Sequence, residues 1–132
     1  MRVVLDTNVF VSAALKASSW PGSVVRWVDR NGTLLRSDVT AAEILEVLQR
    51  PRFAGVIPPS YVDNVRRMLG AAEQVRIAER IVACRDPKDD KFLELAVNGR
   101  TDVIVSGDVT FSRSPISAAS LSSIPRPSGV RR

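Results

Sequence analysis

The feature that most constrains the fold is a short apolar run near the start of the chain that leads directly into an aspartate. Val3, Val4 and Leu5 precede Asp6, and such a run is typical of a buried parallel β-strand. Asp6 would then lie at the carboxyl end of the strand, the edge where open α/β sheets bind ligands. A carboxylate there loses hydration unless a positive group meets it, and we expect that group to be a metal ion.

A second apolar run ends in the same way near the other end of the chain. Residues 103–105 are apolar and lead through Ser106 to Asp108. In a parallel sheet the carboxyl ends of all strands share one edge, so Asp6 and Asp108 are expected to converge there. The alternative is that each aspartate only caps a turn or a helix.

Apolar periodicity, caps and turn residues divide the rest of the chain into alternating helices and strands. This alternation predicts an α/β fold, a three-layer α/β/α sandwich around a parallel sheet of about four strands. Residues 71–83 fit either a helix or a helix that runs into a strand at 80–83. The other expected elements are helices over 9–16, 23–30, 38–50, 58–69 and 87–97, and strands over 3–5, 33–36 and 102–106.

The composition excludes several kinds of chemistry. The chain has no histidine, which excludes Ser-His-Asp and Cys-His catalysis and any histidine-ligated zinc site. The single cysteine, Cys84, cannot form an internal disulfide, and no apolar run is long enough to span a membrane, so we expect a cytoplasmic protein. The net charge of +5 is poor evidence for nucleic-acid binding, because residues 109–132 hold four arginines and no acid.

Three further acids are candidates to join the two aspartates. Glu43 shares an otherwise apolar stripe of its predicted helix, with apolar residues four positions before and after it. Asp89 lies on the core-facing stripe of the helix predicted over 87–97, and Asp90 points about 100° away. Asp89 is therefore the better ligand candidate, with Asp90 close behind. The alternative is that Asp89 completes a capping box and Asp90 is solvated. Converging carboxylates need a hard cation such as Mg²⁺ or Mn²⁺, and such a site performs phosphoryl chemistry.

Four segments together resemble a known family. They read VLDTN around Asp6, EILEVL from Glu43, CRDPKDDKFLELA from Cys84, and VSGD up to Asp108. This combination resembles the PIN-domain nucleases, and it is closest to the group described as toxins of toxin–antitoxin systems. The segment from Cys84 is the most specific of the four.

The resemblance implies a Mg²⁺- or Mn²⁺-dependent endoribonuclease that forms a homodimer and is silenced by a cognate antitoxin. The acids it implies as catalytic metal ligands are Asp6, Glu43, Asp89 or Asp90, and Asp108. It also implies that Thr7, Asn8 and Ser106 orient the carboxylates or water.

The chain departs from the family after Asp108. Residues 109–132 are rich in Ser, Pro, Ala, Arg and Gly, without periodicity, and disorder is the default prediction for such a segment. We therefore expect a PIN-like domain over 1–108 and an atypical polar tail over 109–132. The sheet would lack the family's last strand, which leaves the strand at 102–106 with an uncovered edge.

Two other functions remain open. The altered ending favours a catalytically impaired PIN-fold protein that binds RNA or another protein. A phosphatase of the haloacid-dehalogenase type also begins with an aspartate after a strand. That mechanism needs a second aspartate two residues later, and this chain has Asn8 there.

An out-of-frame reading would account for the ending. Codons can be chosen for residues 110–125 so that a shifted frame spells LLALADFRGIPILDP, which is the ending expected of the family. The nucleotide sequence of the gene tests this hypothesis. Codons that cannot give that text in the shifted frame would rule it out.

Overall fold

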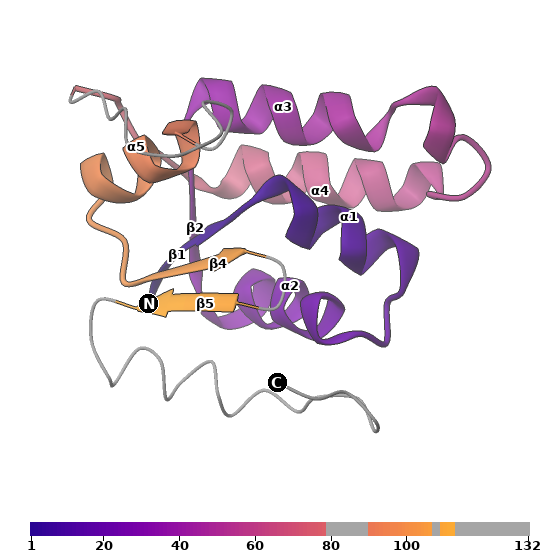
Figure 1. Ribbon diagram of the computed structural model, residues 1–132, viewed down its shortest axis with the longest axis horizontal. Helices are drawn as coiled ribbons and strands as arrows, with labels where there is room; N and C mark the ends of the chain where they lie inside the picture. Colours follow the sequence, from indigo (N-terminus) through magenta and orange to yellow (C-terminus); the bar gives the residue numbers. More distant parts are fainter. Residues whose placement is uncertain (79–89, 107–108, 113–132) are drawn as a thin grey trace.

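A parallel β-sheet lies between two layers of helices in the computed structural model, which describes residues 1–78, 90–106 and 109–112 (Figure 1). The sheet has the strand order β3-β2-β1-β4-β5. The first four of these strands are parallel, and β5 runs antiparallel to β4. The predicted three-layer α/β/α class is confirmed. The strands are β1 (Arg2–Leu5), β2 (Thr33–Arg36), β3 (Glu73–Gln74), β4 (Val103–Ser106) and β5 (Val109–Ser112).

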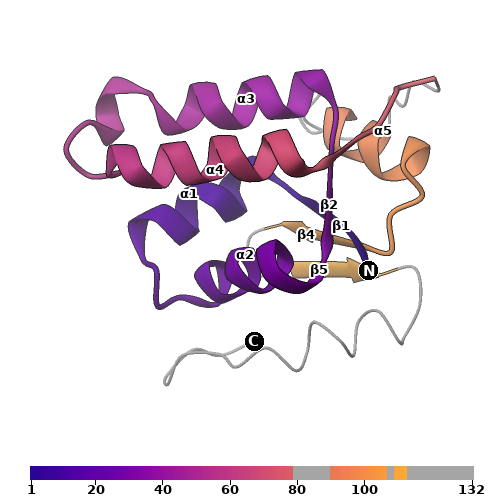
Figure 2. The same cartoon turned by 180° about the vertical axis from the view of Figure 1, so that it is seen from behind.

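Helices α3 and α4 run side by side on one side of the sheet, and α2 lies on the opposite side (Figures 1 and 2). Helix α1 packs against both α2 and α3, and α5 packs against α3, β1 and β2. In the part of the chain that the structure describes, no helix is long and apolar enough to cross a membrane. The helices are α1 (Thr7–Leu15), α2 (Trp20–Asn31), α3 (Asp38–Leu48), the 3₁₀ turn η1 (Pro51–Phe53), α4 (Pro59–Ala71) and α5 (Asp90–Asn98).

Strand β1 is buried on both faces, and β4 is buried on one face and partly buried on the other, where Ile104 lies. Val3 and Val4 of β1 and Val103 and Val105 of β4 are inaccessible to solvent, which explains why both strands are continuous apolar runs in the sequence. Their registers place Leu5 opposite Val105. Asp6, which follows Leu5, and Ser106, which follows Val105, therefore lie at the same edge of the sheet.

The stretch after α4 is a short strand where the sequence allowed a helix. Glu73 and Gln74 form β3, parallel to β2. Arg2 reaches from β1 to hold this strand, since its Nη1 donates to Glu73 Oε1 at 2.8 Å and its Nη2 donates to Glu73 Oε2. The hydrogen bond from Arg2 lowers the pKa of Glu73. The strand expected at 80–83 and the helix start expected at 87–89 lie outside the described residues.

The expectation of an uncovered edge on β4 is wrong. Strand β5 pairs with the whole of β4, from Val103 opposite Ser112 to Ser106 opposite Val109. Residues 109–112 alternate between apolar and polar, as a half-buried strand does. The disorder prediction overlooked this four-residue pattern because it was based on the composition of all of 109–132. The pairing gives the backbone groups of β4 partners on both sides.

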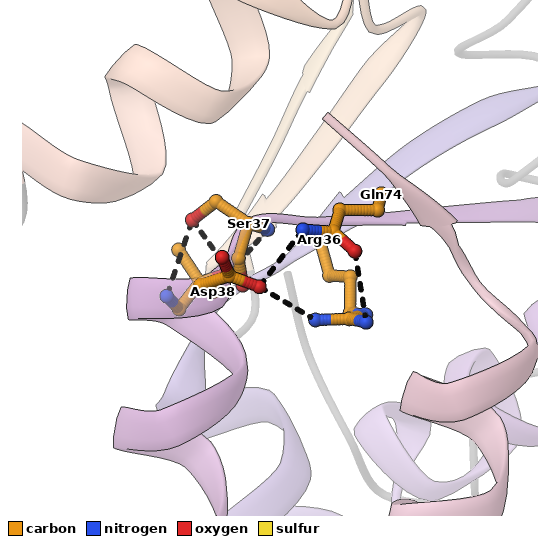
Figure 3. Close-up of polar contacts among 5 residues, drawn as sticks. Arg36, Ser37, Asp38 and Gln74 are labelled. Carbon is orange, nitrogen blue, oxygen red and sulfur yellow. Dashed lines mark hydrogen bonds and ion pairs between the residues drawn. The ribbon is translucent and has the colours of Figure 1, made fainter. Parts of the chain in front are cut away.

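Ser37 fixes the start of α3 at the end of β2. The Ser37 side chain accepts a hydrogen bond from Thr40 N (3.2 Å), and Thr40 Oγ1 accepts one from Ser37 N (3.0 Å), which completes a capping box. Asp38, the first residue of the helix, contacts Arg36 and Gln74 (Figure 3). These contacts join α3 to β2 and β3, and so determine where Glu43 lies.

We predict that Ser37→Ala lowers the free energy of unfolding by about 1 kcal/mol, because the first turn of α3 loses its cap. Urea denaturation of the purified protein measures the change. Ser60→Ala, at an exposed position in the first turn of α4, should change stability by no more than about 0.5 kcal/mol. Equal effects of the two substitutions would contradict the capping role of Ser37.

Candidate metal centre

Asp6 lies where the sequence places it, at the carboxyl end of β1. Its backbone N–H donates to Val105 O at 3.1 Å, so the β1–β4 pairing continues up to this residue. Its Oδ1 caps α1 by accepting from Val9 N at 3.0 Å, and its Oδ2 accepts from Ser106 Oγ at 2.5 Å. A carboxylate oxygen has two lone-pair sites. Asp6 can therefore cap the helix and still offer oxygen to a cation.

Glu43 is joined to the same edge through Thr7. Thr7 is the first residue of α1, only 8% exposed, and its Oγ1 donates to Glu43 Oε2 at 2.5 Å. Since Asp6 and Thr7 are neighbours in the chain, two predicted acids and two predicted orienting hydroxyls form one connected group. The members of this group are Asp6, Thr7, Glu43 and Ser106.

Lys91 lies on the other oxygen of Glu43. Its Nζ donates to Glu43 Oε1 at 2.6 Å, and the two side chains are 21% and 25% exposed. The sequence predicts a divalent cation beside the carboxylates, and the structure adds an ammonium group on Glu43. Lys91 did not appear among the sequence candidates. No local pattern in the sequence indicates it, because its partner lies in another helix.

The remaining predicted site residues are not tested by the described side chains. Asn8 is exposed on the first turn of α1, and its orienting role stays a prediction. Asp90 begins α5, but its side chain lies outside the described residues, as do Asp89 and Asp108. Within the described residues, no three acidic or cysteine side chains gather closely enough to form a metal cluster.

The oxygens of Asp6 and Glu43 nevertheless suit a hard divalent cation. Mg²⁺ keeps several waters and is usually bound through one or two carboxylates. The adjoining hydroxyls of Thr7 and Ser106 hold these carboxylates in place, which is the usual role of the groups around a metal ligand. With the charge of Lys91 included, Asp6, Glu43 and Lys91 have a net charge of −1, which favours a cation.

A separate hollow of about 630 Å³ lies between the end of α3, η1 and the start of α4. Its lining is largely apolar, with Phe53, Val56 and Ile57, and it includes none of the predicted site residues. The charged residues at its rim form surface ion pairs, Arg50 with Glu46 and Arg66 with Asp63. Asp63 is the one carboxylate among the described residues that line this hollow, so the hollow offers no pair of carboxylates for a divalent cation.

Comparison with known proteins identifies a family for this chain. The profile of a family described as PIN domain matches residues 2–110. A protein described as uncharacterized, MJ1680 of Methanocaldococcus jannaschii, is 26% identical over 117 residues, which cover 82% of this chain and 71% of that protein. The family match includes Asp6, Glu43, Lys91 and Ser106.

A double-mutant cycle tests the connection between α1 and α3. Thr7→Val keeps the shape of the side chain and removes the donor to Glu43. We predict that Thr7→Val and Glu43→Gln are coupled by about 1 kcal/mol in the free energy of unfolding, because glutamine offers the Thr7 hydroxyl a neutral acceptor in place of a charged one. Urea denaturation of the four proteins measures this coupling.

The control replaces Glu43→Gln with Glu46→Gln, because Glu46 is an exposed glutamate of the same helix that pairs with Arg50. Thr7→Val and Glu46→Gln should act independently. If Thr7→Val were equally independent of Glu43→Gln, the charge of Glu43 would not strengthen its hydrogen bond with Thr7.

Proposed function

Because this chain belongs to the PIN-domain family, whose members are generally metal-dependent nucleases, we propose that it is an endoribonuclease that uses Mg²⁺ or Mn²⁺. The observation that supports the proposal most directly is the joint placement of Asp6 and Glu43. Asp6 follows β1, Glu43 lies in α3, and the hydroxyls of Thr7 and Ser106 hold both at the carboxyl edge of the sheet. Ligands of parallel α/β sheets bind at this edge.

Asp6 and Glu43 would hold the divalent ion through their carboxylate oxygens. When bound, such an ion polarises a phosphodiester and lowers the pKa of a bound water. The protein's own contribution is orientation, because Ser106 donates to Asp6 and Thr7 donates to Glu43. Phosphoryl chemistry depends mainly on positioning and on electrostatic stabilisation.

Asp108 and one of Asp89 and Asp90 would complete the site. Lys91 follows Asp90 and contacts Glu43, which supports a place for the acidic pair near the same carboxylate. Asp108 comes two residues after Ser106, which contacts Asp6. Separate Asn substitutions of Asp89 and Asp90 would decide between them, since only the true ligand should weaken Mn²⁺ binding.

Three finer proposals rest on the resemblance to the toxin group of the family. They are an RNA substrate, a homodimer and a cognate antitoxin. The cytoplasmic location stays an expectation from the sequence. Light scattering of the purified protein tests the dimer, and a monomeric mass would remove it from the proposal. Induced expression in bacteria tests the toxin role, and normal growth with full RNase activity would contradict it.

A catalytically impaired PIN-fold protein is the second candidate. The family match ends at residue 110. The polar segment beyond it departs from the ending expected of the family, and that departure favours impairment. Such a protein would bind Mn²⁺ or RNA and leave the RNA intact. The cleavage experiment below therefore separates the two candidates.

We predict Mn²⁺-dependent cleavage of a labelled single-stranded RNA, and a loss of about 100-fold or more in rate for Asp6→Asn, because the substitution removes a metal-binding carboxylate. Gel analysis of timed reactions with added Mn²⁺ or EDTA measures the rate. The matched control is Asp63→Asn, which removes an exposed carboxylate from α4 and should leave the rate unchanged. Cleavage that persists in EDTA, or in the Asp6→Asn protein, would overturn the nuclease proposal. Mn²⁺ binding without any cleavage would favour the impaired protein.

A further inference from the structure

We infer that Lys91 is an internal counter-ion of Glu43, and that its ammonium group leaves Glu43 when a divalent cation binds. This inference rests on the proposed function, since it concerns the same two carboxylates. It assigns to Lys91 the control of metal affinity. The protein would exchange one cation for another at Glu43 without leaving the carboxylate unpaired.

The contacts of Glu43 support this exchange. Both of its oxygens accept hydrogen bonds in the structure, Oε1 from the Lys91 ammonium and Oε2 from the Thr7 hydroxyl. The Thr7 hydroxyl is neutral and can remain beside a bound cation. The ammonium is 2.6 Å from Oε1, so a divalent ion coordinated to that oxygen at about 2.1 Å would lie close to a like charge. Lys91 and the metal ion therefore compete for Glu43.

The burial of Lys91 supports a specific role for this residue. Its side chain is directed inward and is only 21% exposed, although a lysine gains entropy by extending into water. The contact with Glu43 offsets this penalty. The pairing also links α5 to α3, which are distant in the sequence.

Charge balance predicts the effect of the exchange. In the ion pair the ammonium cancels the charge of Glu43, so Glu43 does not remain a partly buried, unpaired carboxylate. A bound divalent cation takes over this role, and its affinity is reduced by the work of displacing the ammonium. Neutralising Lys91 should therefore strengthen metal binding, whereas loss of a metal-binding or purely structural side chain would weaken it or leave it unchanged.

Calorimetric titration with Mn²⁺ alone tests this inference. We expect Lys91→Met to bind Mn²⁺ about tenfold or more tightly than the unmodified protein, because the competing charge is removed while the aliphatic stem is kept. Lys91→Arg, which retains the charge, should bind no more tightly than the unmodified protein. Lys16→Met, at an exposed position after α1, makes the same change in net charge and should alter the affinity less than twofold.

The outcomes separate this inference from the proposed function. If the unmodified protein binds Mn²⁺ and Lys91→Met binds it equally or more weakly, the exchange is overturned and the nuclease proposal stands. If the unmodified protein binds no Mn²⁺, both are overturned. A tighter Lys91→Met complex with an unchanged Lys16→Met control supports the exchange.

A measurement on the unmodified protein covers the case in which Lys91→Met does not fold. Lysine-selective ¹⁵N NMR, assigned with Lys91→Arg, detects an ammonium group held in a hydrogen bond. We expect the Lys91 signal in EDTA to shift to that of a solvated ammonium on addition of Mg²⁺. A signal that stays unchanged at saturating Mg²⁺ would overturn the exchange.

Discussion

The candidate site depends on the parallel pairing of β1 with β4. The buried valines of the two strands fix the register, and a slip by one residue would turn every side chain of β1 to the other face. In this register the backbone of Asp6 bonds to Val105 and its side chain accepts from Ser106. The hydrophobic core thereby determines which polar groups meet at the carboxyl edge of the sheet.

Helices α1 and α5 each place one side chain against Glu43, at the same edge of the sheet. Helix α1 contributes Thr7, and α5 contributes Lys91, each to a different oxygen of the carboxylate. A half-buried carboxylate with two donors from two helices is held in one orientation, which a metal ligand requires. The same arrangement makes the resting charge of the site depend on Lys91. Metal affinity is then a property of the competition between two cations, and not of the acids alone.

Features that depend on local sequence were predictable, and features that depend on long-range pairing were not. The apolar runs identified β1, β2 and β4, and Ser37 identified the start of α3, because burial and capping leave patterns within a few residues. Strand β5 was missed because its four residues pair with β4 through backbone hydrogen bonds, inside a segment whose overall composition predicts disorder. Lys91 was missed because its partner lies in another helix, and no spacing rule connects α3 to α5. The sequence brought attention to Asp6, Glu43 and Ser106, whose contacts the structure describes, while the contributions of Asp89, Asp90 and Asp108 stay predictions.

A crystal structure of the protein with Mn²⁺, with the ion located by its anomalous scattering, tests the central claim most directly. We expect one Mn²⁺ ion coordinated by carboxylate oxygens of both Asp6 and Glu43 at about 2.1 Å. We also expect Lys91 Nζ to have left Glu43 Oε1. An ion bound elsewhere, or no ion at all with Lys91 still on Glu43 at high Mn²⁺ concentration, would contradict the shared metal centre.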